Sequence, residues 1–235
     1  GDVYKRQIQS GKTPGSIVED SPVSFGSWSP KNYENDYEGS MTYRYALQHS
    51  RNVAAVKIAD EVGMTKVIKL AKEMGISTLT DQDYNLSTAL GGLTHGVTPL
   101  EMVQAYGVLA NGGIKVQPTA ILKIVDRNGQ VVEEHSIQEK RVVDEKDAAI
   151  ITNMLESVIN GGTGGNAAIG RPAAGKTGTT DDSKDAWFVG YTPDLVAAVW
   201  IGDDYGSETL RGITGGDTPA IMWGQFMANA LANTP

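Results

Sequence analysis

Three strand-like segments near the end of the chain are joined by links that are too short for a parallel arrangement. They cover residues 173–180, 186–192 and 195–201. The first link reads DDSKD, and the second is a turn at residues 193–194. Because a parallel crossover needs about a dozen residues, strands joined this closely must be antiparallel neighbours. The sequence therefore predicts an antiparallel sheet that starts with AAGKTGTT.

Helical periodicity precedes and follows this sheet. The clearest helix start is at Thr98, where Pro99 suits the first helical position and Glu101 completes a capping box. Asn128 and Gly129, between two β-rich runs, are typical of a hairpin turn. Further helices are expected at residues 42–63 with a break near 50–52, at 67–74, at 144–158 and at 219–232. Helices, an antiparallel sheet and a closing helix together predict one domain of the α+β class.

Charge and composition exclude several classes of protein. The 235-residue chain has a formal net charge of −8, which gives no electrostatic footprint for nucleic acid. It contains no cysteine, so disulfides, thiolate metal sites and a cysteine nucleophile are excluded. Its histidines, His49, His95 and His135, are far apart in the sequence, so no metal site is predicted, and no motif calls for a cofactor.

Residues 170–177 satisfy G-x-x-x-x-G-K-[ST], the pattern of a phosphate-binding loop. Such a loop needs a buried strand before its first glycine and a helix that begins at the lysine. The preceding residues, TGGNAAI, are too rich in glycine for a central strand, and a polar run follows Thr177 up to the next strand. These surroundings disfavour nucleotide binding.

The same letters place Lys176, Thr177, Gly178 and Thr179 on the first strand of the predicted sheet. A glycine there lets a ligand backbone lie flat against the strand, which favours pairing with an extended peptide. The lysine ammonium and the hydroxyls of Thr177 and Thr179 are suited to bind a carboxylate. The plainer alternative is a surface lysine next to a turn.

Ser50, Arg51 and Asn52 stand at the predicted helix break. A serine hydroxyl can relay a proton, and an asparagine amide can both donate to and accept from a peptide backbone. Serine and asparagine also favour helix caps, so this second interpretation stays open.

S-x-N followed by K-T-G resembles two of the three motifs of the penicillin-recognising serine acyltransferases. Longer stretches resemble the transpeptidase domain of class A penicillin-binding proteins, from about residue 13 to the final helix: SRNVAAVKIADEVG, GGLTHGVTPLEMVQAYGVLANGG, AAGKTGTT and DAWFVGYTP. The resemblance implies a β-lactamase/transpeptidase-like fold, in which helices flank an antiparallel sheet. It implies cross-linking of peptidoglycan stem peptides at the extracytoplasmic face of the bacterial cytoplasmic membrane, and binding of β-lactam antibiotics. The family's parent proteins carry a membrane anchor and a glycosyltransferase domain.

The resemblance also implies a role for each matching residue. Ser50 would pass a proton towards the leaving amine, and Asn52 would bond the substrate amide. Lys176 would attract the terminal carboxylate, with Thr177 and Thr179 as hydrogen-bonding partners. The backbone N–H of Thr179 would be one of two oxyanion donors.

The third motif of the family, S-x-x-K, carries the nucleophilic serine, and no serine of this sequence has a lysine three residues later. The family's path is matched only from about residue 11, and the opening GDVYKRQ is foreign to it. We therefore expect residues 1–10 to be a non-matching remnant of assembly and residues 11–235 to be a partial transpeptidase domain. Such a domain lacks the nucleophile helix and the N-terminal strands that would pair beside LVAAVWI. Alone, it is expected not to be acylated and to expose an apolar strand edge.

Two alternative functions stay open. A β-lactamase or D,D-carboxypeptidase of the same fold would use water in place of the amine acceptor. A pseudoenzyme would bind stem peptides or another partner without chemistry, which agrees with the absence of S-x-x-K. The longer flanking stretches favour the transpeptidase.

Overall fold

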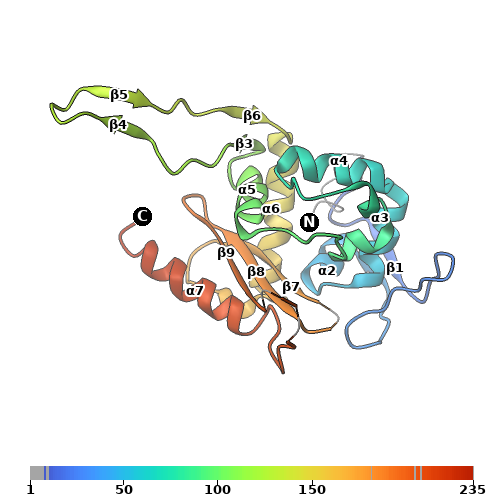
Figure 1. Cartoon of the computed structure of the whole chain (residues 1–235). Coiled ribbons are helices and arrows are strands. Elements are labelled where there is room, and N and C mark those ends of the chain that lie inside the picture. Colours follow the sequence, from blue (N-terminus) through green and yellow to red (C-terminus); the bar gives the residue numbers. More distant parts are fainter. Residues whose placement is uncertain (1–7, 9–10, 181, 204, 207, 235) are drawn as a thin grey trace.

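The computed structural model describes residue 8 and residues 11–180, 182–203, 205–206 and 208–234. A three-stranded antiparallel sheet lies between helices (Figure 1). Helices α5 (Pro99–Ala110) and α6 (Glu145–Ile159) pack against one of its faces, and α7 (Thr218–Ala230) packs against the other. This arrangement confirms the predicted α+β class.

The sheet contains β7 (Ala174–Thr179), β8 (Asp185–Tyr191) and β9 (Val196–Gly202) in that order. Both pairings are antiparallel, and each strand bound lies one residue from the predicted bound. Within the described residues β7 and β9 are the edge strands. Every residue of β9 is partly buried, because α5 and α7 cover its two faces.

Before the sheet, the described residues form three more helices besides α5 and α6, and three short 3-10 helices. The predicted break at residues 50–52 separates α2 from α3. The capping box at the start of α5 is also confirmed, since Thr98 Oγ1 accepts from Glu101 N–H and the Glu101 carboxylate accepts from Thr98 N–H. The elements are α2 (Tyr43–Gln48), α3 (Asn52–Val62), α4 (Met64–Met74), η1 (Asp81–Asp83), η2 (Leu86–Leu90) and η3 (Gly165–Ala167).

Three pairs of short strands complete the fold of the described residues. They are β1 (Ile17–Asp20) with β2 (Gly39–Thr42), β3 (Ile114–Val116) with β6 (Glu139–Arg141), and β4 (Lys123–Val125) with β5 (Val131–Glu134). The β4–β5 hairpin extends away from the body of the domain (Figure 1). Its turn differs from the two-residue turn that Asn128 and Gly129 favour, because only Gly129 has a positive φ, of 81°. Asp126 organises the turn instead: its carboxylate accepts from the N–H groups of Asn128 and Gln130.

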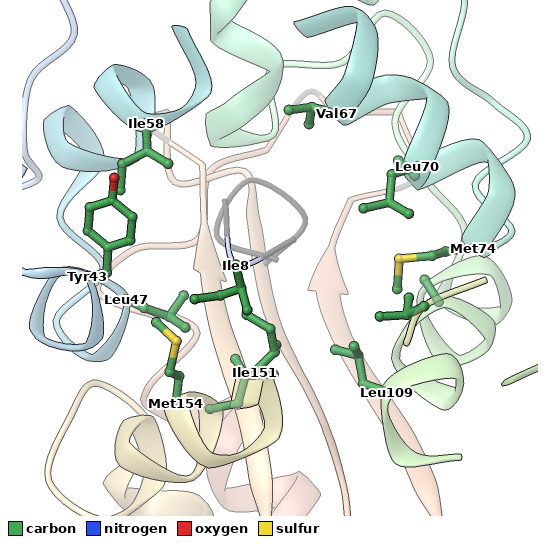
Figure 2. Packing of buried hydrophobic residues seen from close by; sticks show 14 of the residues in the cluster. Ile8, Tyr43, Leu47, Ile58, Val67, Leu70, Met74, Leu109, Ile151 and Met154 are labelled. Atoms are coloured by element: carbon green, nitrogen blue, oxygen red, sulfur yellow. The ribbon is translucent and has the colours of Figure 1, made fainter. Parts of the chain in front are cut away.

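The main hydrophobic core lies among the helices (Figure 2). Ile8 is buried at its centre, near Leu47, Ile151 and Met154. The other residues of the predicted non-matching opening, 1–7 and 9–10, lie outside the described residues. A second, smaller core fills the space between the sheet and α7, where Phe188 packs against Trp223 with ring centroids 5.2 Å apart.

Side chains along β7 and β8 alternate between these two cores. Tyr191 contacts Tyr106 of α5, so the odd-numbered residues of β8 face the helical core. Phe188 faces α7. Lys176 is the register partner of Val189, and Thr177 is the partner of Phe188. Lys176 and Gly178 therefore share the helical face, whereas Thr177 and Thr179 share the α7 face.

Candidate active site

Lys176 and Ser50 meet although 126 residues separate them in the sequence. The Lys176 ammonium donates to Ser50 Oγ at 2.8 Å and to the carbonyl oxygen of Thr177 at 3.0 Å. Burial lowers the pKa of Lys176 to about 8, because protein atoms replace much of the water that would stabilise the charge. The structure thus brings a serine hydroxyl to a lysine that can exchange a proton near neutral pH.

Ser50 is held by the way that α2 ends. Its N–H donates to the carbonyl of Leu47, and the N–H of Arg51 donates to the carbonyl of Ala46. These two bonds define a Schellman motif, in which the residue after the cap adopts the left-handed conformation and is usually glycine. Ser50 occupies that position with a φ of 54°. Its hydroxyl does not cap the next helix, because Arg51 is the N-cap of α3.

Asn52 begins α3 and lies on the wall of a polar cavity of about 650 Å³. Its Nδ2 donates to the backbone carbonyl of Lys31 at 3.0 Å, so the amide is held by the loop between β1 and β2. Ser50 lines the same cavity. The cap interpretation of the serine and asparagine is therefore wrong for both side chains, since neither bonds an N–H group at a helix start.

Thr177 and Thr179 line the polar cavity from the opposite side. Thr177 Oγ1 shares a hydrogen bond of 2.7 Å with Thr163 Oγ1, and Thr179 Oγ1 accepts from the N–H of Gly215 at 3.0 Å. A β-carbon on Gly215 would collide with the backbone of Gly178. This glycine lets the segment before α7 approach β7 closely enough to close one end of the cavity.

The backbone of β7 offers donors along its open edge. The N–H of Thr180 donates to the carbonyl of Asp185, on the side of β8. Successive N–H groups of a strand point to opposite sides, so those of Thr177 and Thr179 point away from β8. The Thr179 N–H is therefore free of the ladder that joins β7 to β8, as an oxyanion donor must be.

A second cavity, of about 520 Å³, lies on the helical face of β7 and is mainly apolar. Lys176 and Gly178 lie on its wall together with Trp187 and Trp200, whose rings are 6.1 Å apart. Thr177 and Thr179 line both cavities, whereas Lys176 and Gly178 line only the apolar one. The residues of K-T-G separate an apolar cavity from a polar one.

The structure adds site residues that the motifs do not reveal. Arg51 is read as a spacer in S-x-N, yet its side chain is 9% exposed and is paired with Asp20. Thr163 and Gly215 contact the two threonines of β7 from distant parts of the sequence. No sequence signal points to Arg51, because its burial and its carboxylate partners are visible only in the structure.

Metal-binding clusters and membrane-spanning helices are both absent from the described part of the chain. No three histidines, aspartates or glutamates there come together in a way that could hold a metal ion. None of the helices in that part combines the length and the apolar character that crossing a bilayer requires.

An α+β domain in which S-x-N meets K-T-G at the edge of an antiparallel sheet has the architecture of the penicillin-recognising proteins. Comparison with known families agrees, since the model described as "Penicillin binding protein transpeptidase domain" matches residues 5–209. The chain belongs to this family.

Relatives and solved structures extend the comparison. The chain is 38% identical over 232 residues to penicillin-binding protein 1A of Aquifex aeolicus, covering 96% of this chain and 31% of that protein. It is 37% identical over 243 residues to penicillin-binding protein 1A of Neisseria gonorrhoeae, covering 97% of this chain and 30% of that protein. The chain thus spans about a third of the length of the curated relatives it matches.

Among solved structures, penicillin-binding protein 1A from Haemophilus influenzae superposes with a TM-score of 0.91 at 26% identity, covering 100% of this chain and 41% of that one. PonA1 from Mycobacterium tuberculosis, solved in complex with penicillin V, gives a TM-score of 0.89 at 28% identity, covering 100% of this chain and 68% of that one. These superpositions confirm the predicted transpeptidase fold.

Proposed function

We propose that this chain supplies the substrate-binding and proton-relay part of a peptidoglycan D,D-transpeptidase, an enzyme of serine acyl transfer. The observation that carries the proposal is the contact of 2.8 Å between Lys176 and Ser50, beside the open edge of β7. The nucleophilic serine of S-x-x-K is not among these 235 residues, and we propose that the parent protein provides it.

The donor stem peptide would bind in extended form along the open edge of β7. Its backbone would pair with the outward N–H groups of this strand, in the manner of an added strand. Its terminal carboxylate would be bound by the Lys176 ammonium and the hydroxyls of Thr177 and Thr179. Asn52, held by Lys31, would donate to or accept from the peptide amide.

In the acyl-transfer step, the absent serine attacks the carbonyl between two terminal D-alanines and the C–N bond breaks. The oxyanion that forms would accept from the Thr179 N–H, together with a second donor supplied with the nucleophile. The attacking serine would give its proton to the lysine of S-x-x-K, which the parent protein also supplies. The Ser50 hydroxyl would give its proton to the leaving amine and recover one from Lys176, and Lys176 would be reprotonated in turn by the lysine of S-x-x-K. A pKa of about 8 suits Lys176 to this exchange, because a group works best as a proton donor when its pKa is near the working pH.

β-Lactam antibiotics would occupy the same groove, and the solved complex of PonA1 with penicillin V supports binding of this class of ligand. The parent protein would work at the extracytoplasmic face of the bacterial cytoplasmic membrane, where its peptidoglycan substrate is found. It would carry a membrane anchor and a glycosyltransferase domain in sequence beyond this chain. No cofactor is required by the proposed chemistry.

The intact mass of the chain after incubation with excess benzylpenicillin tests the covalent part of the proposal. We expect no adduct, and a chain extended upstream to include S-x-x-K should gain the mass of one penicillin. An adduct on the 235-residue chain would place the nucleophile within it and contradict the proposal. Peptide mapping would then name the acylated residue.

Non-catalytic peptide binding is the second candidate, and the absence of S-x-x-K from the sequence favours it. If the extended chain also lacks the motif and forms no adduct, while peptides ending in D-Ala–D-Ala still bind, the pseudoenzyme is the better account. In the extended chain, a β-lactamase or carboxypeptidase would instead form an adduct that water removes.

A further inference from the structure

Arg51 lies between Ser50 and Asn52 and is bonded to three carboxylates. Two of its nitrogens, Nε and Nη2, donate to Asp20 Oδ2 at 2.9 and 2.6 Å. Nη2 lies 3.1 Å from a carboxylate oxygen of Asp36, and Nη1 lies 2.9 Å from one of Glu38. We call Arg51, Asp20, Asp36 and Glu38 the arginine clasp. Its carboxylates come from β1 and from the loop that joins β1 to β2.

The inner part of the clasp is shielded from water. The Arg51 side chain is 9% exposed and that of Asp20 is 0% exposed. Burial opposes ionisation of Asp20, yet hydrogen bonds from Asn32 and Arg51 lower the pKa of this carboxyl below its ordinary value. The pair is therefore charged at neutral pH, and a charge left without its partner there would be strongly unfavourable.

Asn32 connects the clasp to the start of α3. Its Nδ2 donates to Asp20 Oδ1 at 2.8 Å, and its Oδ1 accepts from the N–H of Val53 at 3.1 Å. The neighbouring carbonyl of Lys31 accepts from Asn52 Nδ2. The loop between β1 and β2 thus contacts all three residues that follow Ser50, through both side chains and backbone.

Ser50 needs such support because its conformation is not the preferred one for a serine. A non-glycine residue in the left-handed region is strained, and it persists only where the surroundings fix it. Arg51, which follows Ser50, is fixed at both its backbone and its side chain. Its N–H donates to the carbonyl of Ala46, and its guanidinium is bound in the clasp. The backbone on either side of Ser50 therefore cannot relax without separating Arg51 from its carboxylates.

We propose that Arg51 is a positioning residue, which holds Ser50 and Asn52 at the site through its clasp with Asp20, Asp36 and Glu38. The catalytic meaning of this inference rests on the proposed function. The positioning of Ser50 against Lys176 does not rest on it, because this contact exists in the 235-residue chain whether or not the chain takes part in catalysis.

The experiment follows the titration of Lys176 by NMR in protein labelled with ¹³C at the ε-carbon of lysine, with Lys176→Arg used to assign the signal. In Arg51→Met, the Ser50 hydroxyl should move away from Lys176, and water should reach the Lys176 ammonium. The pKa of Lys176 should then move from about 8 towards the ordinary 10.5. Arg51→Lys keeps the charge but loses the fork geometry, so it should give a smaller shift in the same direction.

Arg44→Met is the matched control. Arg44 belongs to α2 and bonds Asn153 and Ser157 of α6, away from the clasp. This variant should lower the melting temperature and leave the titration of Lys176 unchanged. If Arg51→Met melts cooperatively and titrates like Arg44→Met, the proposal is overturned.

Arg51→Met could also fail to fold, since it leaves the buried Asp20 carboxylate without a cationic partner. Glu38→Gln then decides, because Glu38 is 38% exposed and its loss weakens the outer side of the clasp, together with the hydrogen bond that its carboxylate accepts from the Tyr45 hydroxyl. It should raise the pKa of Lys176 less than Arg51→Lys does. If the pKa of Lys176 is the same in Arg51→Lys and in Glu38→Gln as in the unsubstituted chain, the proposal is overturned.

Affinity for a peptide ending in D-Ala–D-Ala separates this inference from the proposed function. In Arg51→Lys the affinity should fall about tenfold, the factor expected when one hydrogen bond to a charged group is lost. If the unsubstituted chain binds no such peptide, the proposed function fails, while the titration of Lys176 still reports whether the clasp holds Ser50.

Discussion

Replacing Lys176 with methionine should stabilise the fold at neutral pH while destroying the site. The ammonium is held among protein atoms, and its three described hydrogen-bonding partners are a hydroxyl and carbonyl of Thr177 and the hydroxyl of Ser50. None of these is an anion that would compensate the lost hydration. Methionine fills a similar volume and fits the apolar cavity beside it.

The magnitude follows from the pKa. A lysine with a pKa of 10.5 when unfolded and about 8 when folded is disfavoured as a cation in the folded state. The difference corresponds to about 3 kcal/mol at 1.36 kcal/mol per pKa unit, and to about 2 kcal/mol once partial exposure is considered. Below pH 8 both states are protonated and the penalty is complete. Between pH 8 and 10.5 only the unfolded state keeps the proton, so the stability rises with pH across this window.

Urea unfolding of the unsubstituted 235-residue chain and of Lys176→Met, each at pH 7 and pH 10.5, checks this reasoning. Methionine should raise the free energy of unfolding by about 2 kcal/mol at pH 7, and most of this difference should vanish at pH 10.5. Other groups that titrate in this window are common to both proteins and cancel in the comparison. A difference that is constant with pH, or a methionine variant less stable at pH 7, would show that Lys176 is not destabilised by burial.

Three more substitutions test other parts of the structure. Burial opposes the ionisation of Glu101, but hydrogen bonds from Thr98 and Ser77 lower the pKa of this carboxyl to about 2. The stability that the ionised Glu101 gives to the fold is therefore complete above pH 4.5 and is lost as the pH falls towards 2. Glu101→Gln should therefore lower the free energy of unfolding by about 1–2 kcal/mol at pH 7, and the difference should shrink in acid. Ser50→Gly should raise the melting temperature, because glycine adopts the observed φ of 54° without strain, while a peptide ending in D-Ala–D-Ala binds more weakly. Gly215→Ala should lower stability by about 1–3 kcal/mol in urea unfolding, because its β-carbon would displace the backbone of Gly178.

The fold could be predicted to a large extent, because its strongest signals are local. The short links between the three strand segments leave only antiparallel neighbours, and the structure places each strand within one residue of the prediction. The capping box at Thr98 and Glu101 depends on residues three positions apart, so the sequence shows it directly. The hairpin turn is less determined: Asn128 and Gly129 predict it, but the carboxylate of Asp126 selects its geometry.

The site could be predicted only as two separate motifs. The sequence identifies the residue types in Ser50, Asn52 and Lys176, and a resemblance suggests that they act together. The role of Arg51 was missed, because a spacer position says nothing about carboxylates that are 13 to 31 residues away.

What the sequence determined by itself is the order and type of the helices and strands and the chemical groups that they carry. These depend on periodicity, turns and caps, whose energies arise between residues a few positions apart. Only the tertiary structure decided that Lys176 touches Ser50, that Thr177 and Thr179 line a polar cavity that Gly178 does not reach, and that a buried arginine holds the serine in a left-handed conformation. Packing of distant segments brings these groups together, and the low pKa of Lys176 exists only once that packing has removed its water.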